Sequence, residues 1–186
     1  MLSLQDVGFV GAAGTSNPLF YSQEIHTDEM GGGMYGITYA QGGTYFEGSS
    51  SALIGKTIGA VGFFIKRIGS PTGTLSFKAI TFESDATGTT NQTWTPSETD
   101  VSAISTSGEW IESTGETSYV LAANDVITPY CSDFGSSDSS NKLELRGKGS
   151  LSITGQRWCE FNTSEYWNTG SATNQGNIRL YSTAAP

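Results

Sequence analysis

The side chains best suited to chemistry in this sequence are aromatic rings and amides that gather toward the C-terminus. Trp and Tyr rings can lie against the apolar C–H faces of sugars, while Asn, Gln and acidic side chains can bind sugar hydroxyl groups. Tyr166, Trp167 and Asn168 fall in a polar segment that lacks the apolar alternation needed to bury both rings, and Trp158 precedes them. These residues, with Trp94 as a weaker addition, are our candidate glycan-binding residues.

A purely structural role is the alternative for these aromatic residues. Trp167 would then close one end of the folded domain, as large amphipathic rings often do. An exposed ring on a rigid loop indicates function, whereas a buried ring belongs to the core. Both interpretations stay open at this point, and we expect Trp110 to be a core residue.

Residues suited to acid–base or covalent catalysis are few. His26 is the only histidine, and the sequence has no Gly-x-Ser-x-Gly motif, so a His-dependent nucleophile is not favoured. A glycosidase needs two carboxylates that flank the scissile bond. The pairs Glu109/Glu112 and Glu160/Glu165 would serve by count alone, and nothing in their spacing selects them. We therefore predict a protein without enzymatic activity, with a glycoside-active enzyme as the weakest alternative.

Metal and disulfide chemistry have only weak support in the sequence. One histidine and two distant cysteines do not make a closed zinc site. The Ser132–Asp138 loop has two aspartates and a glycine but not the EF-hand pattern, so we predict no cofactor and keep a structural calcium ion as an alternative. Cys131 and Cys159 either form a disulfide in an oxidising compartment or stay separate as small buried side chains.

The overall composition excludes some classes of partner. The 186 residues include 18 acidic and 9 basic side chains, and the net charge is −9. Few scattered cations are unfavourable for binding nucleic acid or anionic membranes. No stretch approaches the 18 or so apolar residues of a membrane-spanning helix, and the start of the chain lacks the pattern of a signal peptide.

Period-two alternation of apolar residues predicts β-strands along most of the chain. The clearest run, 57–82, has two alternating halves around a turn at Pro71 and Gly73, and it predicts an antiparallel hairpin. A second hairpin is expected over 117–131, and a loop over 83–100. Further short strands are expected at 34–40, 44–47, 142–147, 150–154, 156–161 and 177–181.

These segments predict an all-β fold. We expect an antiparallel β-sandwich over residues 36–182, with a jelly roll as the favoured topology. Residues 1–35 are expected to form an irregular arm that ends near the three glycines at 31–33, and residues 183–186 a short tail. The arm would lie either across a neighbouring subunit or on its own domain.

Two segments resemble the strand–turn–strand units of jelly-roll modules in phage, archaeal-virus and bacterial surface proteins. They are Ile58–Arg67 with Gly69–Leu75, and the later segment Tyr119–Ile127. The matching positions are core and turn positions in a minor part of the chain. The resemblance implies a carbohydrate-binding-like β-sandwich and transfers no ligand-binding residue.

These features together predict a non-enzymatic structural or adhesion protein of a virus particle, located on a capsid or tail. Low charge, a Ser-, Thr- and Gly-rich composition, and the missing export signal favour a virion or extracellular location. The expected partners are further copies of the chain or other virion proteins, and surface glycans. The main alternative is a secreted or cell-surface carbohydrate-binding module.

Overall fold

The computed structural model describes residues 19–22, 28–34, 42–48, 50–81, 89–115, 117–134, 140–148, 153–161, 167–169 and 175–183. This part of the chain is almost wholly antiparallel β-structure, which confirms the all-β prediction. Its strands are β1 (Leu19–Ser22), β2 (Asp28–Met34), β3 (Gly42–Phe46), β4 (Thr57–Ile58), β5 (Ala60–Ile68), β6 (Thr74–Thr81), β7 (Thr90–Pro96), β8 (Glu109–Thr114), β9 (Tyr119–Val120), β10 (Asp125–Ser132), β11 (Lys142–Lys148), β12 (Gln156–Phe161), β13 (Trp167–Thr169), β14 (Gln175–Gly176) and β15 (Ile178–Tyr181).

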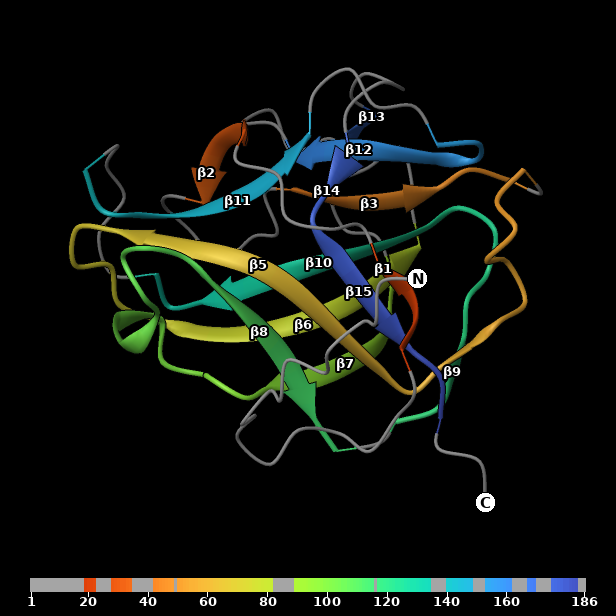
Figure 1. Cartoon of the computed structure of the whole chain (residues 1–186), viewed down its shortest axis with the longest axis horizontal. Coiled ribbons are helices and arrows are strands. Elements are labelled where there is room, and N and C mark those ends of the chain that lie inside the picture. Colours follow the sequence, from red (N-terminus) through yellow and green to blue (C-terminus); the bar gives the residue numbers. More distant parts are fainter. Residues whose placement is uncertain are drawn as a thin grey trace, which may run out of the picture.

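Thirteen of the strands form one curled antiparallel sheet, whose two parts, called sheet A and sheet B, pack face to face as a β-sandwich. The strands β4 and β9 form a separate two-stranded sheet. Sheet A consists of β1, β15, β5 and β8, with β11, β2 and β14 continuing it beside β5. Sheet B has the order β7-β6-β10-β3-β12-β13. A short pairing of Thr95 and Pro96 in β7 with Thr114 and Ser113 in β8 joins the two sheets along one side. Figure 1 shows β8 and β15 running across the direction of β6 and β10.

The space between the sheets holds one large apolar core. Period-two alternation places every second residue of β5, β6 and β10 in this core, because successive side chains of a strand point to opposite faces. Burial of this apolar surface is the main favourable contribution to folding. The largest buried side chains of the core include Phe46, Ile58, Ile65, Phe77, Trp94, Ile111, Ile127, Leu143 and Ile178.

The pairing of the predicted hairpins is wrong, although their strands are present. β5 pairs with β8, β11 and β15, while β6 pairs with β7 and β10, so the 69–73 turn carries the chain from sheet A to sheet B. In the second predicted hairpin, β9 pairs with β4 and not with β10. A Pro–Gly turn is compatible both with a hairpin and with an arch between sheets. The jelly-roll order of strands stays a prediction.

Two segments differ from their expected conformations. Within residues 1–35, which we expected to be irregular, β1 pairs with β15 and β2 pairs with β11 of the same chain. The three glycines at 31–33 lie inside β2. Part of the expected loop 83–100 is the strand β7, which pairs with β6.

Helical structure is minor in the part of the chain that the structure describes. It consists of one 3-10 turn at Val101–Ala103, where the Asp100 side chain caps the backbone N–H of Ser102. None of the described segments is a helix of the length and apolarity needed to cross a membrane.

Candidate functional site

The outer face of sheet A presents a group of aromatic and charged side chains on three neighbouring strands. We call Phe64 (β5), Trp110 and Glu112 (β8), and Arg179 and Tyr181 (β15) the aromatic–charge row. Phe64 pairs with Trp110 across β5 and β8, and Glu112 and Arg179 both pair with Gly62 from opposite sides. Their chain neighbours Ile111, Ile178 and Leu180 lie in the core, so alternation directs the row outward.

Gly62 provides the space in which the row assembles. A Cβ atom at this position would lie 3.0 Å from Cγ of Glu112 and 3.6 Å from Cβ of Arg179. With only hydrogen at Gly62, the side chains of the two outer strands meet above the middle strand, where Arg179 Nη1 donates to Glu112 Oε1 at 3.0 Å. The glycine is therefore a packing requirement of the site.

Trp110 is held by two ring contacts. The Arg179 guanidinium carbon lies 4.0 Å from the centroid of the Trp110 ring, which is cation–π stacking distance. Phe64 meets Trp110 at a centroid distance of 5.9 Å in a nearly perpendicular arrangement. The indole N–H of Trp110 has no acceptor among the described residues, so ring contacts and not a hydrogen bond fix the side chain. Phe64 and Trp110 both remain partly exposed.

Glu112 connects the charged part of the row. Its Oε1 atom accepts from Arg179 and also from the hydroxyl group of Tyr181. Burial of Tyr181 and its hydrogen bond to Glu112 raise the pKa of the phenol above its usual range, so Tyr181 stays a donor at physiological pH. The Glu112 side chain is 28% exposed and that of Arg179 is 18% exposed, so both can be reached from solvent.

A second charged group continues the outer face of sheet A along β11. Glu144 is buried, and its carboxylate lies 3.0 Å from Lys142 Nζ and 3.8 Å from Lys66 Nζ, with Arg146 as a third partner. Burial alone would raise the pKa of Glu144, but the hydrogen bond from Lys142 and the charges of Arg146, Lys142 and Lys66 lower it overall. This group is an ion-pair network that joins β5 and β11.

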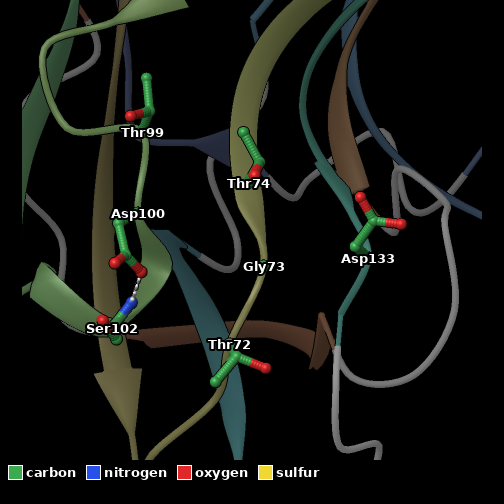
Figure 2. A pocket seen from close by; sticks show the side chains of 7 residues that line it. All are labelled: Thr72, Gly73, Thr74, Thr99, Asp100, Ser102 and Asp133. Carbon is green, nitrogen blue, oxygen red and sulfur yellow. Dashed lines mark hydrogen bonds between the residues drawn. The ribbon is translucent and has the colours of Figure 1, made fainter.

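A polar groove lies where β6 begins and β10 ends, and Figure 2 shows the residues that line it. It has a volume of about 440 Å³, and the chain segment Thr72–Thr74 separates Asp100 on one side from Asp133 on the other. Backbone hydrogen bonds from Leu75 N to Thr99 O and from Val101 N to Gly73 O hold its walls. The hydrogen bonds from Ser102 to Asp100 lower the pKa of that carboxyl, which therefore stays ionised.

The groove has fewer features of a binding site than the row. Its lining consists of hydroxyl side chains, two carboxylates and a glycine, without an aromatic ring for a sugar to contact. The Ser132–Asp138 loop, which the sequence offered as an alternative calcium site, contributes Asp133, and its residues 135–138 lie outside the described part. Among the residues that the structure describes, no three His, Cys, Asp or Glu side chains gather in one place. The candidate site is therefore the aromatic–charge row.

Two of the sequence-predicted glycan-binding residues are in the core, so their assignment is corrected. Trp94 is 1% exposed in β7 and packs edge to face against Tyr119 at 5.9 Å. Trp158 is 2% exposed in β12, and a Cβ at either Gly42 or Gly176 would collide with its ring. Rings buried in this way have no face available to a sugar.

For the other residues predicted to bind glycans, Trp167, Asn168 and Tyr166, that role stays a prediction. Trp167 and Asn168 belong to the strand β13, which pairs with β12, and the description does not extend to their side chains. Tyr166 lies outside the described residues, as does His26.

The carboxylate pair Glu109/Glu112 does not have the arrangement of a glycosidase site. The two residues are three positions apart on β8, so their side chains leave opposite faces of the strand. Glu109 accepts a hydrogen bond from the backbone N–H of Ser105, whereas Glu112 belongs to the row. For the second pair, the side chain of Glu160 is not described and Glu165 lies outside the described residues.

Cys131 and Cys159 form no disulfide and lie on opposite faces of sheet B, so the disulfide alternative is wrong. Cys131 belongs to the core between the sheets, whereas Cys159 belongs to a small outer cluster with Tyr45, Ile80 and Val126. Burial and the nearby charge of Asp133 raise the pKa of the Cys131 thiol to about 12. These thiols act as small buried hydrophobic side chains, which was the alternative to a disulfide in the sequence analysis.

Sequence reasoning missed Trp110 as a site residue and placed it in the core. The signal was present in the tripeptide Trp110-Ile111-Glu112, because a strand that buries Ile111 must turn both of its neighbours outward. The partner Arg179 carried a similar signal between the buried residues Ile178 and Leu180. What alternation does not reveal is that β8 and β15 lie on either side of β5.

Comparison of the chain with models of protein families, with curated proteins and with solved structures finds no match in any of the three.

Proposed function

We propose that this chain is a non-enzymatic adhesion protein of a virus particle or cell surface, and that it binds glycans through the aromatic–charge row. The observation that carries the proposal is the partly exposed Trp110 ring, fixed by Arg179 and Phe64 on an outer sheet face. A prearranged ring loses little conformational freedom when a ligand binds. Beside it, Glu112 and Arg179 provide the acceptor and donors that sugar hydroxyl groups require.

The composition supports the adhesion role and the location. The chain has a net charge of −9 and only 15% charged residues, which suits an extracellular or particle-bound protein better than a partner of nucleic acid. Self-association through the N-terminal segment has less support than the sequence indicated, because β1 and β2 pair with strands of the same chain. Glycan binding is therefore the favoured part of the proposal.

The test is a binding measurement on a glycan array with the Trp110→Ala variant. Removal of the ring should weaken binding about fivefold or more, since an aromatic contact contributes roughly 1 kcal/mol. Tyr130→Ala is the matched control, because Tyr130 also carries a cation on its ring, Lys78 at 3.3 Å, but lies on sheet B. That control should bind like the wild type.

Two results would contradict the proposed site. Unchanged binding of a folded Trp110→Ala variant would remove the aromatic–charge row from consideration. Loss of binding in Trp167→Ala with normal binding in Trp110→Ala would return the site to the C-terminal segment predicted from the sequence. Circular dichroism of each variant verifies that the β-structure is retained.

A further inference from the structure

The charges of the aromatic–charge row are already paired within the protein, and this limits the kind of glycan that the row can bind. Arg179 donates to Glu112 at 3.0 Å, so the positive charge that an acidic sugar would need is engaged by a carboxylate. The hydrogen bonds that Arg179 and Tyr181 donate to Glu112 both go to the same carboxylate oxygen, Oε1.

The second carboxylate oxygen of Glu112, Oε2, is the atom of this side chain that can accept a further hydrogen bond. Among the described residues, no hydrogen bond or ion pair is made to Glu112 Oε2, and the side chain is 28% exposed. A carboxylate oxygen only accepts hydrogen bonds, so it favours hydroxyl donors and repels carboxylate or sulfate groups. The partly exposed rings of Trp110 and Phe64 beside it offer apolar surface to the C–H face of a sugar.

We infer that the ligand of the row is an uncharged glycan, whose hydroxyl groups donate to Glu112 Oε2, and that Glu112 excludes acidic glycans. The inference rests on the proposed function and specifies its ligand class. Glu112 thus has two effects: it neutralises Arg179 and it presents an acceptor to solvent. Its replacement by the isosteric Gln removes the negative charge that lies beside Arg179.

The experiment measures binding to pairs of immobilised glycans that differ only in sialylation or sulfation. Wild-type protein should bind the uncharged member about tenfold or more tightly than the acidic member. The affinity for the uncharged glycan should change little between low and physiological salt. The ligand carries no charge, so there is no charge–charge attraction for salt to screen. Glu112→Gln should lose this preference and bind acidic members with a strong dependence on salt.

Glu47→Gln is the matched control. Glu47 forms a two-pronged ion pair with Arg157, with both distances 2.8 Å, beside sheet B. The substitution frees an arginine by the same chemical change at a different place, so it should leave the wild-type preference unchanged. Acquisition of acidic-glycan binding by Glu47→Gln to the same extent as by Glu112→Gln would contradict a local effect at the row.

The remaining outcomes separate the inference from the proposed function. Wild-type binding that prefers acidic glycans and weakens with salt overturns the inference and leaves glycan binding intact. Failure of the wild type to bind either member of any pair overturns both. If Glu112→Gln does not fold, the preference and salt dependence of the wild type alone decide between these outcomes.

Discussion

At the scale of single residues, Gly155 shows how closely two segments of the backbone approach each other. It has a φ of +71°, and a Cβ at this position would lie 2.1 Å from the backbone nitrogen of Ser51 and 2.3 Å from the carbonyl carbon of Ser50. The Gly155 carbonyl also accepts the Glu47 N–H at 2.9 Å. The approach joins the turn before β12 to the segment after β3, whose strands pair with each other.

Gly155→Ala should therefore destabilise the protein more than a comparable glycine replacement. Gly55 has a similar φ of +79°, but a Cβ there meets nothing within 4 Å. Gly55→Ala should cost only the left-handed strain of about 1–2 kcal/mol. Gly155→Ala should cost at least about 2 kcal/mol more, because backbone atoms must move. Urea unfolding of the two variants measures the difference, and equal stabilities would contradict the close approach.

At this scale, the sequence predicts the role of a residue well when its type allows only one role. It fails when the same residue type is compatible with both a buried and an exposed role. For Cys131 and Cys159 the sequence allowed either a disulfide or two separate buried thiols. Only their positions on opposite faces of sheet B decide for the separate thiols. Trp94 and Trp158 have the same chemistry as an exposed tryptophan. Their burial depends on β6, Gly42 and Gly176, which are distant in the sequence.

At the scale of elements, the alternation of apolar residues located strands well and their partners poorly. β5, β6, β10, β12 and β15 correspond to predicted strands. The partner strands could not be deduced. Alternation with a period of two residues indicates which face of a strand is buried, but it does not indicate which strand lies beside it. The polar strand β7 was missed for a related reason, since its residues other than Trp94 and Pro96 are not fully buried and give no apolar run.

The ion-pair network around Glu144 makes the pairing of β5 and β11 sensitive to pH. Glu144 lies directly opposite Lys66, while Lys142 and Arg146 flank it on its own strand. Its lowered pKa means that the ionised carboxylate stabilises the folded state. This stabilisation is complete above the ordinary value of 4.5 and disappears as the pH falls through the lower pKa of the folded state.

Glu144→Gln should reduce the free energy of unfolding at pH 7 by about 1–3 kcal/mol, because three cations lose their common partner. The difference between wild type and variant should shrink as the pH drops below 4.5. Urea unfolding at a series of pH values measures it. A difference that is constant with pH, or that grows in acid, would contradict the role assigned to the carboxylate.

At the scale of the whole molecule, the two sheets have different outer faces. The outer face of sheet A displays the aromatic–charge row and the Glu144 network, with most charges paired. The outer face of sheet B holds a small apolar cluster of Tyr45, Ile80, Val126 and Cys159, beside which Lys78 lies over the ring of Tyr130. We propose that recognition belongs to the outer face of sheet A, where the aromatic–charge row would bind glycans.

The most direct test of this account is a map of backbone amide chemical shifts during titration with an uncharged oligosaccharide that the protein binds on an array. We predict that the shifts change at 62–64 of β5, 110–112 of β8 and 179–181 of β15, which surround the row. Changes confined to 158–176, or to the outer face of sheet B, would contradict the assignment of binding to sheet A.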